Sequence, residues 1–173
     1  MKEVAWIAVA FGLLSLVSPL LGSLDSQFFA PDFALLTALY LGSRSTLLSG
    51  LLCAFVVGLL KDGLSLSVPV GLYTEINVLA FLMARVLERR VDLHSPVPLM
   101  ATAAGMSVGA TGLFLMLEAI FHRSFEAYGD VLRMALPLAL ITMLMAPVQF
   151  ALLDRITRRF ELHHRAGVLP MRR

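Results

Sequence analysis

The amino-acid sequence predicts an all-α integral membrane protein with six transmembrane helices. Apolar residues make up 58% of its 173 residues, only 15% are charged, and the mean hydropathy is +0.84. Soluble domains have roughly half apolar and about a quarter charged residues. The apolar residues also form long blocks, without the alternation that marks one buried face of a soluble helix or strand. The length fits one membrane domain, at residues 1–153, followed by a basic tail at 154–173.

The first predicted span covers residues 4–22, an apolar block of nineteen residues. This length crosses about 30 Å of hydrocarbon. A signal peptide is the alternative, but its apolar core has roughly 7–15 residues and ends at a cleavage site of small residues. The block is longer than that, and the sequence from Gly22 to Asp25 is a poor cleavage site. We therefore expect a spanning helix.

The second predicted helix, at residues 28–42, is short. Pro31 and Asp32 suit a helix start, because proline fits the first turn and a carboxylate favours the positive helix end. The purely apolar part has only ten residues, so we expect a tilted or partly buried helix. A tight turn at 42–45 follows, around Arg44, because the apolar stretch would otherwise be far longer than one crossing needs.

The third and fourth helices, at residues 46–60 and 70–87, form a predicted helical hairpin. Small residues recur on the third helix at a spacing of four, and we call them the first stripe: Gly50, Ala54 and Gly58. Residues at this spacing share one helix face. Small side chains on that face let a second helix backbone approach closely inside a membrane.

Four polar residues lie toward one end of this hairpin: Asp32, Asp62, Glu75 and Asn77. Ionisable residues within membrane spans are costly and usually face protein or water. One interpretation is a polar pocket or partner-binding site near the outer face. The other is structural, with Glu75 capping a helix or bonding to neighbouring backbone. The sequence leaves both interpretations open.

The fifth and sixth helices are predicted at residues 99–121 and 131–153, after a proline-containing loop at 87–98. The fifth helix carries a second stripe of small residues: Ala101, Gly105 and Gly109. The sixth contains Pro137 and Pro147, which should kink it unless neighbouring groups satisfy the freed carbonyls. We expect the tail to begin as a short helix that then frays.

Basic residues are unequally distributed between the two sides of this six-span arrangement. Eleven of the fourteen fall at the termini and in or beside the loops at 42–45 and 87–98. Cytoplasmic segments of membrane proteins carry an excess of Lys and Arg. We therefore predict that both termini are cytoplasmic. The basic tail adjoins the membrane, so it fits anionic lipid better than nucleic acid.

The sequence offers no constellation of residues for catalysis, metal binding or cofactor binding. The single Cys53 excludes an internal disulfide, and the four histidines lack the spacing of metal ligands. Motifs of serine hydrolases, zinc peptidases and phosphate-binding loops do not occur. We therefore expect a protein that is not an enzyme and that uses neither a metal nor a cofactor.

Three short motifs resemble those of the rod shape-determining protein MreD family. They are Pro31-Asp32-Phe33, Gly58-Leu-Leu-Lys61-Asp62 and Pro69-Val-Gly71-Leu72-Tyr73, and an arginine-rich loop follows them. The resemblance covers most of the chain and includes the six spans and the short basic tail. Lys61 departs from the family pattern, in which an apolar residue is expected before the aspartate.

This resemblance implies a non-catalytic scaffold of the bacterial elongation machinery, located in the cytoplasmic (inner) membrane. It also implies a bitopic partner, MreC. Through MreC the protein would link MreB filaments to the glycan polymerase and transpeptidase that build side-wall peptidoglycan and maintain cell shape. The single spanning helix of MreC would pack on one of the two stripes. We favour the first stripe, because Asp62 and Glu75 lie at its outer end.

The resemblance also carries a rival function. The MreD fold is similar to the substrate-binding subunits of energy-coupling-factor vitamin transporters, which use small-residue motifs on their first helix to meet the transporter. Ala8-x-x-x-Gly12 is a weak match to such a motif. A vitamin pocket needs aromatic and polar lining, and the lone Trp6 and few buried polar groups make the transporter subunit the second choice.

Overall fold

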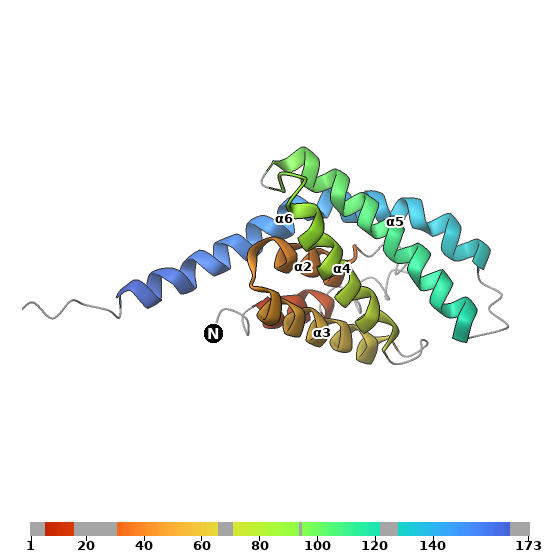
Figure 1. The fold of residues 1–173 in the computed structure, drawn as a ribbon, viewed down its shortest axis with the longest axis horizontal. Coiled ribbons are helices and arrows are strands. Elements are labelled where there is room, and N and C mark those ends of the chain that lie inside the picture. The colour runs from red at the N-terminus through yellow and green to blue at the C-terminus, as the bar shows by residue number, and fades with distance from the viewer. Residues whose placement is uncertain (1–5, 16–30, 66–70, 94, 122–127, 167–173) are drawn as a thin grey trace, which may run out of the picture.

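A computed structural model describes residues 6–15, 31–65, 71–93, 95–121 and 128–166. These residues are all helical or lie in turns between helices. A helical segment at Trp6–Ser15 precedes the five labelled helices, which are α2 (Phe33–Arg44), α3 (Leu47–Leu64), α4 (Leu72–Glu88), α5 (Pro96–Phe121) and α6 (Tyr128–Ala166) (Figure 1). The rest of the predicted first span, residues 16–22, lies outside the described part.

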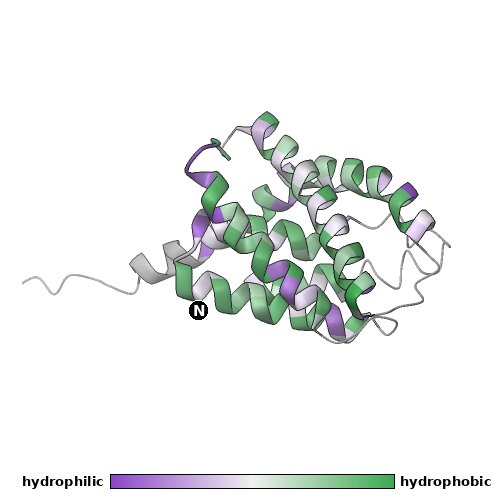
Figure 2. Ribbon diagram, turned by 45° about the vertical axis from the view of Figure 1, so that its right-hand side comes forward, coloured by the Kyte–Doolittle hydropathy of each residue, from purple (hydrophilic) through white to green (hydrophobic). Residues whose placement is uncertain are grey.

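Within the described residues, three helical segments are long and apolar enough to cross a membrane: Leu47–Leu64, Pro96–Ile120 and Val131–Arg159. Hydrophobic residues run along most of each coloured helix in Figure 2. Large apolar side chains on α6 point outward every four residues, at Leu132, Leu136, Leu140, Leu144 and Val148. A contiguous exposed apolar surface of this kind marks contact with lipid or with another protein. The structure therefore has the character of a membrane protein.

Helix α2 lies at the centre of the structure and is enclosed by its neighbours. Every residue from Phe33 to Gly42 is buried, as expected of a helix that is apolar on all sides. Its twelve residues give a length of about 18 Å, well short of a bilayer core. It packs against α3, α4, α5 and α6. The tilted or partly buried helix predicted here is thus a fully enclosed one, and residues 28–30 of that prediction lie outside the described residues.

Close backbone approach at glycines joins α2, α3 and α4. A Cβ added at Gly58 would lie 2.5 Å from the Cα of Thr74, in the first turn of α4. A Cβ added at Gly42 would lie 2.6 Å from the Cβ of Ala84. No side chain fits at such distances unless the helices move apart. Glycine therefore sets how closely α4 packs on the two preceding helices.

Several helix ends differ from their predicted positions, among them the end of α2, which continues to Arg44 through part of the turn predicted at 42–45, and the start of α6 at Tyr128. Helix α3 continues to Leu64 instead of ending at residue 60, so that Lys61 and Asp62 lie in its last turns. Helix α5 begins at Pro96 instead of residue 99. Proline is tolerated in the first turn because the backbone N–H that it lacks would have no helical acceptor there. The loop predicted at 87–98 is correspondingly shorter.

Helix α6 runs without interruption across the predicted boundary between membrane domain and tail at residues 153 and 154. It has 39 residues and contains Pro137 and Pro147. The short separate tail helix predicted from the sequence is therefore part of α6. In Figure 1 its C-terminal turns, drawn in dark blue, extend beyond the other helices. The residues change from apolar to basic at this boundary, but the backbone remains helical.

Candidate functional site

Polar side chains gather at the two ends of α3. One group, which we call the Asp62 end, consists of Asp32, Lys61, Asp62 and Tyr73. The other, the arginine end, consists of Tyr40, Arg44, Ser45, Arg85 and Asp154. The eighteen residues of α3 separate the two by about 27 Å, close to the thickness of a hydrocarbon core.

The carboxylate of Asp62 caps the N-terminus of α4. It is 5% exposed and accepts hydrogen bonds from the backbone N–H groups of Gly71, Tyr73 and Thr74, at 3.1, 2.9 and 3.0 Å. The hydroxyl of Thr74 donates a fourth. The first N–H groups of a helix have no partner within it, and a negative charge there is favourable. Asp62, on the preceding helix, supplies both the hydrogen-bond acceptor and the negative charge. Its carboxylate therefore stabilises the start of α4.

Asp32 occupies the equivalent position at the start of α2 and also pairs with Lys61. Its Oδ1 accepts from the backbone N–H of Leu35 at 3.1 Å, and its Oδ2 lies 2.7 Å from the Nζ of Lys61. The same ammonium lies 4.3 Å from the centre of the Tyr73 ring, a cation–π contact. Lys61, the departure from the family pattern, therefore connects α2, α3 and α4.

Glu75 and Asn77 do not join this network. Glu75 is exposed in the first turn of α4, where a carboxylate complements the helix dipole. Asn77 is 2% exposed, and its Nδ2 has no hydrogen-bond partner among the described residues. The structure thus brings Asp32 and Asp62 together and leaves the other two predicted residues apart. The capping role considered for Glu75 falls to Asp62.

Sequence reasoning missed several buried polar residues, of which Gln149 and Glu118 are the largest. Gln149 of α6 donates from Nε2 to the carbonyl of Phe33 at 3.0 Å and to the hydroxyl of Thr37 at 2.8 Å, which ties α6 to the central helix. Glu118 of α5 is 4% exposed. It lies one turn beyond Phe114, whose ring stacks on Tyr73 at 5.8 Å, and thus toward the Asp62 end. A lone carboxylate within a long apolar helix was the signal that could have found Glu118.

The two stripes of small residues have opposite surroundings. Gly50, Ala54 and Gly58 are buried, and α4 covers them through Phe81 and Thr74. Ala101, Gly105 and Gly109 are exposed, and a Cβ added at either glycine meets no described atom within 4 Å. The first stripe is thus used inside the fold, contrary to our preference for it as the partner-binding face. The second stripe is open.

At the arginine end, one hydrogen-bonded chain joins the first helical segment, α2 and α6. The hydroxyl of Tyr40 donates to Asp154 at 3.0 Å and lies 3.1 Å from the hydroxyl of Thr157. The indole N–H of Trp6 donates to the same threonine at 2.9 Å. Arg44 pairs with Asp154 at 3.6 Å. These bonds hold the beginning of the chain beside the basic part of α6.

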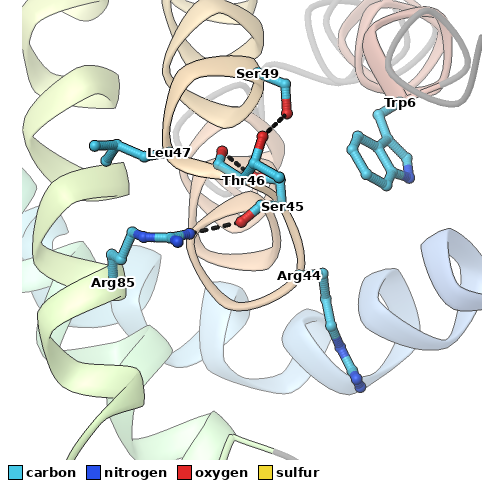
Figure 3. Close-up of a pocket in the computed structure, with 7 residues that line it drawn as sticks. All are labelled: Trp6, Arg44, Ser45, Thr46, Leu47, Ser49 and Arg85. Carbon is cyan, nitrogen blue, oxygen red and sulfur yellow. Dashed lines mark hydrogen bonds between the residues drawn. The ribbon is translucent and has the colours of Figure 1, made fainter.

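A pocket of about 400 Å³ opens at this end, between the α2–α3 turn and α4 (Figure 3). Seven residues line it: Trp6, Arg44, Ser45, Thr46, Leu47, Ser49 and Arg85. Arg85 reaches from α4 to the turn, where its Nη1 donates to the carbonyl of Ser45 at 2.6 Å.

The part of the chain that the structure describes holds no group of three or more His, Cys, Asp or Glu residues that could bind a metal ion. Cys53 is buried in the core. The geometry is therefore that of a helical membrane protein with two polar ends and one open face of small residues. No protein-family model, curated protein or solved structure matches this chain.

Proposed function

We propose that this protein is a non-catalytic membrane scaffold of the bacterial cell-elongation complex, a member of the MreD family that binds the spanning helix of MreC. Through MreC it would connect MreB filaments to the enzymes of side-wall peptidoglycan synthesis. The motifs around Asp32, Asp62 and Gly71 support the family. The observation that carries a binding function is the open face of α5 at Ala101, Gly105 and Gly109.

The exposed faces of α5 and α6 differ in a way that favours this choice. On α6 the outward row consists of large side chains, with Leu136 70% and Leu144 59% exposed, which suits contact with lipid chains. On α5 the outward row is small at three successive turns. Lipid removes the hydrophobic driving force between helices, so that close van der Waals contact becomes decisive. A second helix gains more of that contact on α5 than on α6.

We also propose six spans, with both termini on the cytoplasmic side of the inner membrane. The support is the alternation of helix ends: α2 and α4 start at the Asp62 end, whereas α3 starts at the arginine end. The Trp6–Thr157 hydrogen bond brings the first helical segment and the basic part of α6 to the arginine end as well. Among the described residues, the basic side chains of Arg44, Arg85, Arg155, Arg158 and Arg159 therefore lie toward one end, which supports a cytoplasmic position for that end.

A pull-down of MreC with one bulky variant and one control variant tests this function. Gly105→Leu should abolish capture of MreC while thermal stability stays near that of the wild type, because the leucine projects from an open face. Leu140→Ile on the exposed row of α6 is the matched control and should capture MreC normally. If a folded Gly105→Leu variant still captured MreC, the helix-packing mechanism would be wrong and the loops would be the next candidate.

The same purification distinguishes the scaffold function from the rival function of a vitamin-transporter subunit. A substrate-binding subunit of a vitamin transporter would retain a small molecule, detectable by mass spectrometry of the denatured preparation. It would also retain transporter subunits in place of a bitopic protein with a periplasmic domain. Recovery of a vitamin without MreC would overturn the scaffold proposal.

A further inference from the structure

The pocket at the arginine end has the chemical lining of an anion site. Two guanidinium groups border it from different helices, Arg44 at the end of α2 and Arg85 near the end of α4. Three hydroxyl groups complete the polar lining, those of Ser45, Thr46 and Ser49. The two guanidinium groups and one hydroxyl of the Thr46–Ser49 pair can donate hydrogen bonds to an oxyanion. The hydroxyl of Ser45 already donates to the carbonyl of Leu41.

Both arginines keep donors available for a ligand. Arg85 is held in place by its 2.6 Å bond to the Ser45 carbonyl, which uses one of the five N–H groups of a guanidinium. Arg44 meets Asp154 at 3.6 Å, with both side chains about a third exposed (35% and 34%). That distance is much longer than the roughly 2.7–2.9 Å of a strong charge-assisted hydrogen bond. Arg44, Arg85 and Asp154 together leave one positive charge at the pocket.

The start of α3 adds to this positive potential. Thr46 is the N-cap residue, but its side chain makes no capping hydrogen bond. Its hydroxyl instead pairs with that of Ser49 at 2.8 Å, at the edge of the pocket (Figure 3). The first N–H groups of α3 thus receive no acceptor from Thr46, and the positive helix end lies beside the two arginines.

The pocket also lies at the boundary between polar and apolar surface. Leu47, which lines it, is 54% exposed, and Leu48 and Leu52 on the same helix are 70% and 57% exposed. A phosphate in the pocket would therefore have an apolar helix surface next to it. Among anions, a phospholipid matches this combination, because its charged headgroup and its acyl chains are joined at that level of a bilayer.

We propose that this pocket binds the phosphate group of an anionic phospholipid headgroup. Arg44, Arg85 and the hydroxyl of Ser49 contact the phosphate oxygens, and the acyl chains lie along Leu48 and Leu52 of α3. A pocket of about 400 Å³ is within the usual size range of small-molecule sites. A soluble phosphate ester has the same headgroup chemistry, but it would leave the apolar surface beside the pocket unused.

The test compares lipid binding by the detergent-purified full chain and its variants, using native mass spectrometry and thermal unfolding. Phosphatidylglycerol should bind and raise the unfolding temperature, and phosphatidylcholine should not. Arg44→Gln with Arg85→Gln should weaken phosphatidylglycerol binding by roughly tenfold or more. The control, Arg89→Gln with Arg90→Gln, removes two exposed charges that do not line the pocket and should bind as the wild type does.

Two further measurements test the pocket independently of the arginine variants. Ser49→Leu fills the pocket and leaves both arginines in place, so it should also lose the lipid even if the double arginine variant folds poorly. Glycerol phosphate tests the soluble source, and stabilisation equal to that by phosphatidylglycerol would assign the pocket to a free phosphate ester. Equal lipid binding by wild type and Ser49→Leu, or equal loss in the Arg89–Arg90 control, would overturn the proposal in favour of general attraction to the basic surface.

Discussion

The buried Asp62 and the half-buried Asp32 show how single residues place a charge beside an apolar interior. An isolated carboxylate in a medium of low dielectric constant is very costly. Asp62 avoids this cost because three backbone N–H groups and a hydroxyl surround it. Asp32 avoids it through Lys61 and the start of α2. Both residues therefore stabilise the fold, and neither needs a ligand to explain its presence.

Replacing Asp62 should lower stability more than replacing any exposed acid nearby. Asp62→Ala would leave the N–H groups of Gly71, Tyr73 and Thr74 without this acceptor. The buried N–H of Thr74 alone should cost about 1–3 kcal/mol. Asp62→Asn keeps one acceptor oxygen and should be milder. Thermal unfolding in detergent is the measurement. Glu75→Gln, in the exposed first turn of α4, is the control and should change stability by less than about 0.5 kcal/mol. A wild-type unfolding temperature in Asp62→Ala would refute the capping role.

At the scale of helices, the same sequence pattern has two different uses. The first stripe and the second stripe share their four-residue spacing, yet α4 covers only the first. Spacing shows that a close approach is possible, whereas the identity of the approaching helix depends on tertiary packing. The hairpin of α3 and α4, a short second helix and the gathering of Asp32 and Asp62 at the hairpin end were predictable from the sequence, whereas the full enclosure of α2 was not. The choice between the stripes was not.

Other misses have the same origin. The break predicted after residue 153 rested on a change of composition, but a helix backbone continues wherever its own hydrogen bonds are kept. Gln149 was overlooked because its partners, Phe33 and Thr37, are more than a hundred residues away in the chain. Lys61 departs from the pattern expected of MreD, and the sequence does not show that Asp32 and the Tyr73 ring surround its ammonium group. Contacts between residues so far apart in the chain produce no local pattern in the sequence from which they could be predicted.

A pair of glycine-to-alanine variants distinguishes the two stripes directly. Gly58→Ala should destabilise the protein by roughly 1–3 kcal/mol, because the new methyl group would lie 2.5 Å from the Cα of Thr74 and force α3 and α4 apart. Gly105→Ala adds the same atom where no described atom lies within 4 Å, and should leave stability unchanged or slightly improved. Thermal unfolding of both variants is the test, and equal stability would mean that α3 and α4 do not cross at Gly58.

At the scale of the whole molecule, the two polar ends define an axis. The helices lie between an end with two structural carboxylates and an end with arginines, with exposed apolar side chains along α3 and α6. A membrane would therefore cross the molecule along α3. In the topology that we propose, the basic asymmetry of the sequence would place the arginine end in the cytoplasm. The lipid pocket proposed above would thereby face the inner leaflet, where its phosphate ligand is abundant.

Cysteine labelling of the intact inner membrane tests this orientation. In a Cys53→Ser background, Gly63→Cys should react with a membrane-impermeant maleimide added from outside, because residue 63 is exposed beside Asp62 and has room for a side chain. Arg90→Cys, exposed at the opposite end, should react only after the membrane is opened. Cysteines at Ser26 and Ser124, outside the described residues, should behave as Gly63→Cys does. Labelling of Arg90→Cys from outside would contradict the proposed orientation. If Gly63→Cys were also protected, the molecule would have the opposite orientation, and the proposed lipid pocket would face the outer leaflet.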